Sequence, residues 1–306
     1  STSPAINSGY TISGVTSDIL GNARPQSGAF DIGAYEYVGT PDTPTYIFSL
    51  PSVAKYRQSN EGIPSVVDIL FKSSANIIPG YFFQPYRFAI NKATGKFYVG
   101  DQSSNIVVQF DLLGNQYNGF GGGGPNELGA EDGRFGWFGG VVTDSLGNIY
   151  VLDSDRSRIQ KFDSSGNFLR KWGSNGVGDG QFDFPTDLSI DSQNNIYVMD
   201  SDNCRVQKFD SNGTFIKKWG SYGTGDGQFD YPVGITVDST GSVYVVDTWN
   251  DRVQKFDSNG TFIKKWGSTG SGDGQFSGPQ VAAVDSLNNI YIVDKNNYRI
   301  QKFDSN

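Results

Sequence analysis

Four aspartate–arginine pairs recur along the chain at one spacing, and they are its first candidates for chemistry. Each Asp ends an apolar segment and its Arg follows five residues later; the pairs are Asp153 and Arg158, Asp200 and Arg205, Asp247 and Arg252, and Asp294 and Arg299. A carboxylate beside a guanidinium could take part in acid–base chemistry, but a catalytic group is needed once and this pair is present four times. We therefore expect each Asp to cap a turn and to pair with its Arg across a hairpin.

The composition excludes several kinds of catalytic site. The 306 residues include no His and a single Cys, Cys204. A Ser-His-Asp triad, a His general base and a His-ligated metal all need an imidazole, and a disulfide or a Cys-based zinc cluster needs at least two thiols. We therefore assign no catalytic residue and no metal ligand, and we expect no cofactor.

Calcium is the ion that the sequence leaves as an alternative. The segment from Asp153 to Asp155 resembles the start of a calcium-binding loop, but Arg156 and Arg158 follow it and would repel the ion. Carboxylates that face a central channel, such as Asp187, are the other place where an ion could bind.

The charge balance bears on the class of partner. The formal net charge is -8, which sets up repulsion toward phosphate backbones, so we expect no nucleic-acid partner. No run of about 18 apolar residues is present, so we expect no membrane span.

A 47-residue repeat organises most of the chain. The tripeptide Lys-Phe-Asp recurs in three steps of 47 residues, with its aromatic residue at Phe162, Phe209, Phe256 and Phe303. A fifth and more diverged copy lies upstream, where Tyr98 and Phe110 precede Tyr150 and Phe162 by 52 residues.

Each copy predicts four short antiparallel strands. In the third copy these cover residues 186–190, 195–199, 205–209 and 214–219, with turns rich in Asp, Ser, Asn and Gly between them. The first two strands are almost continuously apolar, as expected for a sheet that neighbouring sheets cover on both faces. The repeat therefore predicts an all-β fold in which each copy is one blade of a β-propeller, with the first strand innermost.

The string GDGQFDFPTDLSIDSQNNIYVMDSDNCRVQKFDSNGTFIKKWG resembles the NHL repeat, which builds β-propellers that usually have six blades. The resemblance covers about residues 81–306 and implies an NHL-type β-propeller with five readable four-stranded blades, the last of which stops after its third strand. We expect either a truncated six-bladed propeller or one in which residues 45–80, otherwise a linker, form a degenerate extra blade.

Residues 1–38 resemble a different family. The strings SPAINSG and SDILGNARPQSGAFDIGAYEYVG are similar to the C-terminal end of secreted bacterial right-handed parallel β-helix proteins. Residues 39–44 have the Pro and Gly content of a linker. The resemblance implies that the propeller belongs to a longer multidomain bacterial protein, located outside the cell or on its surface.

Differences between the copies cluster in two sets of loops that open at one end of a propeller. Residues 206–221 are identical to residues 253–268, yet the preceding turns differ, DSDNCR against DTWNDR. We take these loops as the candidate binding face, with the residues Asp155, Arg156, Asp202, Asn203, Tyr222, Tyr231, Trp249, Asn250, Asp251, Asn297 and Tyr298. Trp249 is the expected anchor, because exposed aromatic residues dominate binding hot spots. Free drift of surface loops is the alternative explanation.

A basic stripe follows the fourth strand of successive copies, at Arg170, Lys171, Lys217, Lys218, Lys264 and Lys265. Fourth strands are outermost in a propeller, so we expect this stripe on the rim, where lysines keep exposed strand edges from pairing with other chains.

Together these features predict a non-enzymatic binding or scaffold module whose loop end binds a protein, a peptide or a glycan. The alternative is a His-free propeller enzyme, similar to the lyases and lactonases among NHL-like propellers, with a metal in the central channel. Resemblance in fold does not choose between the two.

Overall fold

The computed structural model describes residues 85–305, except for residues 92–93, 103, 112–115 and 123–130. The predicted tail, linker and degenerate blade at residues 1–38, 39–44 and 45–80 lie outside the described residues. In the described part of the chain, regular structure consists of strands and three short 3-10 turns. No helix within this part is long and apolar enough to cross a membrane.

The strands form five antiparallel sheets in chain order, which we call blades 1 to 5. Blade 1 contains β1 (Pro85–Asn91), β2 (Lys96–Asp101), β3 (Ile106–Asp111) and β4 (Gln116–Gly121). Blade 2 contains β5 (Phe138–Thr143), β6 (Ile149–Asp153), β7 (Arg158–Phe162) and β8 (Phe168–Trp172). Blade 3 contains β9 (Pro185–Ile190), β10 (Ile196–Asp200), β11 (Arg205–Phe209) and β12 (Phe215–Trp219).

Blade 4 contains β13 (Gly234–Val237), β14 (Val243–Asp247), β15 (Arg252–Phe256) and β16 (Phe262–Trp266). Blade 5 has three strands, β17 (Pro279–Val284), β18 (Ile290–Asp294) and β19 (Arg299–Phe303). The 3-10 turns η1 (Ser154–Arg156), η2 (Thr248–Asn250) and η3 (Lys295–Asn297) join the second strand to the third in blades 2, 4 and 5.

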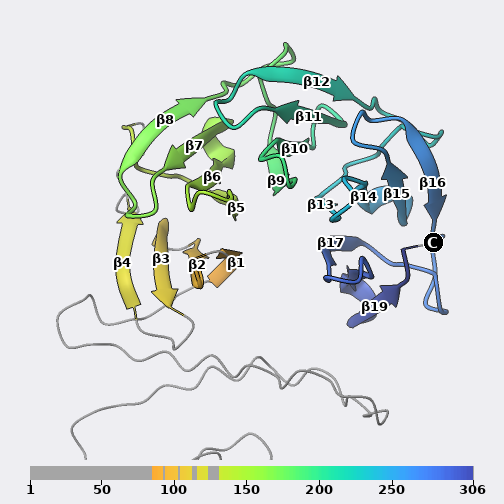
Figure 1. Cartoon of the computed structure of the whole chain (residues 1–306). Coiled ribbons are helices and arrows are strands. Elements are labelled where there is room, and N and C mark those ends of the chain that lie inside the picture. The colour runs from red at the N-terminus through yellow and green to blue at the C-terminus, as the bar shows by residue number, and fades with distance from the viewer. Residues whose placement is uncertain (1–84, 92–93, 103, 112–115, 123–130, 306) are drawn as a thin grey trace, which may run out of the picture. The chain divides into compact units, whose positions relative to one another are not determined.

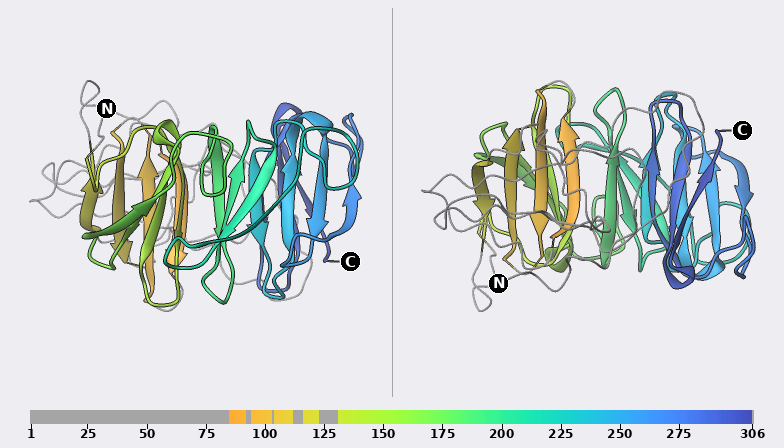
Figure 2. Two further views of the ribbon diagram at one scale, coloured as in Figure 1. Left: turned by 90° about the horizontal axis from the view of Figure 1, so that it is seen from above. Right: turned by 90° about the horizontal axis from the view of Figure 1, so that it is seen from below.

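The blades are arranged around a common axis (Figure 1). The first strand of each blade lies nearest the axis, and β4, β8, β12 and β16 lie farthest from it. Neighbouring blades pack through their innermost strands, β1 on β5, β5 on β9, β9 on β13 and β13 on β17. The arc of described blades is open between blade 5 and blade 1 (Figure 1). Figure 2 views the blades side on and shows their strands running along the axis, with loops at both ends. This arrangement confirms the predicted all-β propeller.

Aromatic side chains fill the space between neighbouring blades. Between blades 2 and 3 the ring of Phe209 lies 6.3 Å from Trp172 and 5.6 Å from Phe182, measured between ring centroids. The copies 47 residues later repeat both contacts between blades 3 and 4, at 6.1 and 5.7 Å. Phe182 and Phe209 are buried, and tilted or edge-on aromatic pairs of this kind add to the free energy of burial. The repeated aromatic residues therefore add a second set of contacts between blades to those of the innermost strands.

In blades 2 to 5, a repeated aspartate between the first and second strands holds the hairpin that joins them. In blade 5, Asp285 Oδ1 accepts hydrogen bonds from the backbone amides of Leu287 and Asn289. Its Oδ2 accepts from Asn289 Nδ2 at 2.8 Å and from the Tyr291 hydroxyl at 3.1 Å. The hydrogen bonds from Asn289, with those from Leu287 and Tyr291, lower the pKa of Asp285 to about 2, because they stabilise the carboxylate form.

Candidate binding face

The aspartate–arginine pairs lie at one end of the propeller, where they fasten two sets of loops together. One set joins the second strand of a blade to its third; the other, which we call the crossings, joins one blade to the next at residues 173–184, 220–233 and 267–278. The backbone amides of Asp202 and Trp249 donate to the carbonyls of Asp183 and Asp230, so the two sets of loops share one end of the molecule. We call it the loop end.

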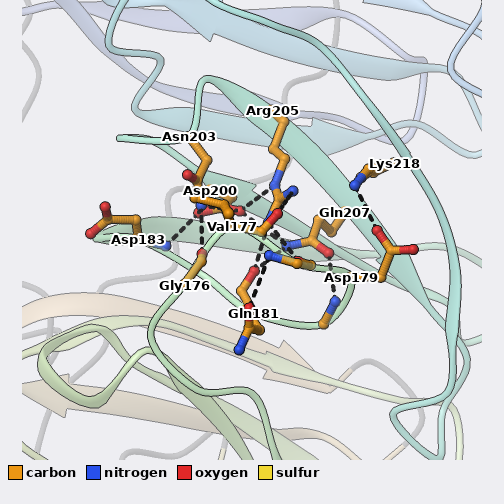
Figure 3. Close-up of polar contacts among 12 residues, drawn as sticks. Gly176, Val177, Asp179, Gln181, Asp183, Asp200, Asn203, Arg205, Gln207 and Lys218 are labelled. Atoms are coloured by element: carbon orange, nitrogen blue, oxygen red, sulfur yellow. Dashed lines mark hydrogen bonds and ion pairs between the residues drawn. The ribbon is translucent and has the colours of Figure 1, made fainter.

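Blade 3 shows how such a pair is used (Figure 3). Arg205 Nε donates to Asp200 Oδ2 at 2.6 Å, and its Nη1 and Nη2 donate to three crossing carbonyls, those of Val177, Gly178 and Gln181. Asp200 Oδ1 accepts from the backbone amide of Asp183 at 2.7 Å, also in the crossing. The pair therefore bonds the crossing to the blade that follows it.

The other three pairs are built in the same way, with arginine Nε to aspartate Oδ2 distances of 2.9 Å in blade 2, 2.6 Å in blade 4 and 2.8 Å in blade 5. In blades 2 to 4 both side chains are buried. Burial raises the pKa of Asp200, and the bonds from Asp183 and Arg205 act in the opposite direction. Because the loops enclose and satisfy the pairs of blades 2 to 4, these pairs serve to position the loop end.

Several of the predicted binding residues also take part in this internal network. Asn203, Asn250 and Asn297 each donate through Nδ2 to the aspartate of their own blade and to a crossing carbonyl. Asp251 accepts from the Gly278 amide and from the Thr269 hydroxyl. These four side chains therefore support the loops.

Asp155 and Arg156 are bound within the loops as well. Asp155 Oδ2 accepts from the backbone amide of Trp137 at 2.7 Å, and Arg156 Nη1 lies 3.3 Å from Asp153 Oδ1. The first contact joins the turn η1 to the segment that leads into β5, and the second joins it to the end of β6.

Four aromatic side chains gather at the loop end around the start of the innermost strands. Trp137, Phe184 and Tyr231 occupy equivalent positions 47 residues apart. Trp137 and Phe184 directly precede β5 and β9, and Tyr231 lies three residues before β13. The rings of Trp137 and Phe184 meet edge to face at 5.5 Å, and the ring of Tyr231 stacks on Trp249 at 4.8 Å with an interplanar angle of 23°. We call Trp137, Phe184, Tyr231 and Trp249 the aromatic mouth.

Two residues of the aromatic mouth have an unfavourable backbone conformation. Phe184 has a φ of +44° and Tyr231 a φ of +42°, a region that bulky L-residues rarely adopt. In blade 5 the equivalent residue is Gly278, with a φ of +58°. Glycine adopts this conformation without a steric penalty, so the backbone does not require an aromatic residue at this position.

Blade 1 contributes to the same region. Burial raises the pKa of Tyr231, and the Asp202 carboxylate and the Tyr86 phenol raise it further. Tyr86 of β1 and Asp202 of blade 3 therefore lie close to the Tyr231 ring of blade 4. Tyr86, Trp137 and Trp249 are exposed, with 42%, 44% and 67% of their surface accessible.

Acidic residues adjoin this group of rings, since Asp183 and Asp230 directly precede Phe184 and Tyr231 in the chain and Asp202 lies close to Tyr231. Within the described part of the chain, no cationic side chain pairs with the carboxylates of Asp183, Asp202 or Asp230. Figure 3 shows the Asp183 carboxylate directed away from the hydrogen-bond network that its backbone amide joins. Partial burial and the charges of Asp183 and Asp200 raise the pKa of Asp202. The mouth therefore carries uncompensated negative charge.

Asp187, the predicted channel carboxylate, lies on the innermost strand β9. Its Oδ1 is 3.8 Å from Arg87 Nε of β1, and its Oδ2 accepts from the Ile235 amide of β13 at 3.1 Å. Arg87 Nε also donates to the Gly139 carbonyl of β5. A Cβ at Gly140 would lie 2.5 Å from Leu188 Cδ2, so this glycine leaves room for the residue that follows Asp187. Among the residues that the structure describes, no group of three acidic or Cys side chains could hold a metal ion.

The basic stripe lies on the outermost strands, and alternate members pair with aspartates of the segments that connect one blade to the next. Lys171, Lys218 and Lys265 form ion pairs with Asp132, Asp179 and Asp226 at 2.5, 2.6 and 2.7 Å. Side chains in these pairs are 42% to 55% exposed, so each pair contributes little to stability.

Comparison with known proteins identifies the repeat. Residues 140–218 match a family described as a 6-bladed beta-propeller, and residues 229–256 and 276–303 match the NHL repeat. The fold is a β-propeller, and two of its repeats match the NHL repeat. A search of curated proteins finds no match.

Solved structures of low sequence identity share this fold. One is titled "Streptogramin B lyase structure" and is 15% identical, with a TM-score of 0.53 over 72% of this chain and 68% of that one. Another is titled "Crystal structure of Nidogen/Laminin Complex" and is 17% identical, with a TM-score of 0.54 over 72% of this chain and 75% of that one. At this level of identity the likeness establishes the fold alone.

The propeller brings together only part of the predicted binding set. Trp249, Tyr231 and Asp202 meet at the aromatic mouth, whereas Tyr222 and Tyr298 are exposed at 72% and 96% and stack on no ring among the described residues. Sequence reasoning missed Trp137, Tyr86 and the unpaired Asp183 and Asp230. An alignment of the copies could have identified Trp137, because blades 2, 3 and 4 each have an aromatic residue at this position, Trp137, Phe184 and Tyr231.

Proposed function

We propose that this propeller is a binding module and that its aromatic mouth holds a protein, peptide or glycan ligand at the loop end. The proposal extends to the setting expected from the sequence, an extracellular or cell-surface bacterial protein with further domains. The exposed ring of Trp249, stacked on Tyr231, supplies the kind of amphipathic surface that anchors ligands in many interfaces.

The backbone conformation of Phe184 and Tyr231 is the observation that carries the proposal. A bulky residue in this region costs on the order of 1–3 kcal/mol, and such strain is concentrated at functional sites. Gly278 performs the same backbone role in blade 5 without an aromatic ring. A binding role explains why the ring is retained in blades 3 and 4 despite that cost, whereas loop support alone does not require it.

No specific observation favours the enzymatic alternative. Asp187, which the sequence offered as a channel ligand for a metal, faces the guanidinium of Arg87. The titles of the two similar structures name a lyase in one and a protein complex in the other, so they do not distinguish the two functions.

The proposal is tested on arrays of immobilised peptides and bacterial-surface glycans. We expect wild-type protein to bind a subset of the array, and we expect Trp249→Ala and Tyr231→Gly to weaken that binding at least about tenfold, which is the loss typical of a hot-spot residue. Lys218→Ala, on the rim, is the control and should bind like wild type. Binding that survives both mouth substitutions but is lost in Lys218→Ala would assign the ligand to the basic stripe instead.

A further inference from the structure

We infer that the ligand of the aromatic mouth is a cationic peptide segment, one that presents an arginine or lysine side chain to Trp249 and Tyr231. This inference rests on the proposed function and narrows it to one class of ligand. It combines two independent features of the mouth, its exposed aromatic faces and its unpaired carboxylates.

The aromatic geometry suits a cation. Trp249 stacks on Tyr231 in an offset arrangement, and with 67% of its surface accessible it leaves much of its ring to solvent. The face of an indole attracts a guanidinium or ammonium group placed within about 6 Å of the ring centre. The chain itself uses this contact at the mouth, where Arg87 Cζ lies 4.4 Å from the ring centre of Tyr86.

The charges favour the same ligand. Asp202 lies close to the Tyr231 ring. Asp230 and Asp183 lie in the same loops, because their main-chain carbonyls accept hydrogen bonds from the backbone amides of Trp249 and Asp202. In the described structure none of these three carboxylates forms an ion pair, although Asp183 and Asp202 repel each other. A cationic side chain bound at Trp249 would relieve this repulsion and would gain charge-assisted hydrogen bonds.

Two arginines of the loops and inner strands near the mouth, Arg156 and Arg87, are already engaged, which argues against an anionic ligand. Arg156 pairs with Asp153, and Arg87 lies between Asp187 and the Gly139 carbonyl. The lysines of the basic stripe lie on the outermost strands, away from the axis. An anionic group bound at this end would therefore add to the negative charge of Asp183, Asp202 and Asp230. Within the described residues, the loop-end cation that forms no ion pair is Lys295 of η3, in blade 5.

The test compares two end-blocked peptides that differ only in charge, Gly-Arg-Gly-Arg-Gly and the same peptide with citrulline in place of arginine. Citrulline keeps the shape and most hydrogen-bonding groups of arginine but is neutral. By isothermal titration calorimetry we expect the arginine peptide to bind at least tenfold more tightly, and we expect the difference to shrink as salt is raised.

Matched variants separate the mouth from the general negative charge of the protein. Asp202→Asn and Asp226→Asn remove the same charge, one at the mouth and one on the rim, and Trp249→Ala and Tyr298→Ala each remove an exposed ring. We expect Asp202→Asn and Trp249→Ala to weaken binding of the arginine peptide at least fivefold, and Asp226→Asn and Tyr298→Ala to leave it within twofold of wild type.

Three outcomes would overturn the inference. The first is equal affinity for the two peptides, and the second is an equal loss in Asp202→Asn and Asp226→Asn. The third is an array ligand that is neutral and depends on Trp249 but not on Asp202; the binding face would then stand and only the ligand class would fail. Loss of the proposed function itself has a different signature, because no array ligand would then respond to Trp249→Ala.

Discussion

Arg87 of blade 1 and Asp187 of blade 3 face each other over the innermost strand of blade 2, with Nε and Oδ1 3.8 Å apart. The separation is longer than a hydrogen bond, and Arg87 Nη2 is buried without a hydrogen-bond partner in the described structure. Ile235 of blade 4 donates its amide to the same carboxylate. One carboxylate therefore links the inner strands of blades 1, 3 and 4, although its charge is incompletely compensated.

This geometry predicts a pH-dependent effect of Asp187→Asn. Burial raises the pKa of Asp187 despite the opposing charge of Arg87. A carboxyl group whose folded pKa is raised favours the native state most when protonated, and this contribution is lost as pH rises through the folded pKa. We expect Asp187→Asn to match wild type near pH 4 and to be the more stable protein at pH 8, by chemical denaturation. A difference that does not change with pH would contradict the prediction.

The contribution of each blade's arginine to the free energy of unfolding should increase with the burial of that arginine. Arg205→Ala leaves Asp200 buried without its cation and frees three crossing carbonyls, so we expect a loss of about 3–5 kcal/mol in the free energy of unfolding. Arg205→Lys keeps the charge but not the planar fork, and should fall between wild type and Arg205→Ala.

The matched control for Arg205 is Arg299→Ala in blade 5. The Arg299 side chain makes the same contacts but is 26% exposed, against 8% for Arg205. We expect a smaller loss there, because water can solvate Asp294 once the guanidinium is removed. Equal losses at the two sites would show that burial does not set the contribution of the pair.

Tyr231→Gly should separate stability from binding. The substitution releases backbone strain of on the order of 1–3 kcal/mol, and it removes the stacking on Trp249 and adds the backbone entropy cost of glycine, about 0.5–1 kcal/mol. We expect a net change within about 1 kcal/mol, measured by denaturant unfolding. Phe229→Ala, two residues earlier and fully buried, should by contrast cost about 3–5 kcal/mol. A loss at Tyr231 as large as that at Phe229 would mean that the ring is a structural element.

Acid should weaken the hairpin turns through Asp285 and its equivalents. The pKa of Asp285 is lowered to about 2 in the folded chain, against about 3.9 for an unperturbed Asp, so its contribution is present above pH 4 and is lost as pH falls toward 2. At pH 7 we expect wild type to have a higher melting temperature than Asp285→Asn. We expect the two melting temperatures to converge between pH 4 and pH 2. Asp273→Asn, which removes a fully exposed carboxylate, is the control and should follow wild type throughout.

The repeat predicts the blades well because its spacing and its apolar runs are direct consequences of the packing. Phe209 and its copies are buried between neighbouring blades, so their positions are constrained in every repeat. The candidate site was less accessible from sequence. Asn203, Asn250 and Asn297 were assigned to a ligand, but their identity in three copies reflects the bonds that each makes to its own aspartate and crossing.

Other features of the mouth depend on contacts between blades that no single repeat contains. The proximity of Tyr86 to Tyr231 joins residues 145 positions apart, and the unpaired state of Asp183 and Asp230 depends on where every nearby cation lies. The spacing of residues within one repeat predicts neither the proximity of the two tyrosines nor the unpaired state of the two aspartates. The positive φ of Tyr231 is likewise hidden in the sequence, although glycine at position 278 points to it.

Because each buried arginine bonds the crossing that precedes its own blade, the natural module of this propeller is a crossing together with the blade that follows it. Such a module contains the arginine that bonds its crossing to its blade, so duplication of one module inserts a unit with all of these contacts. The position of Phe184 and Tyr231 lies inside the module, near the end of its crossing. Each duplication therefore delivers one more side chain to the loop end at a fixed place, and the recognition surface can be enlarged or varied in steps of one residue without redesign of the scaffold.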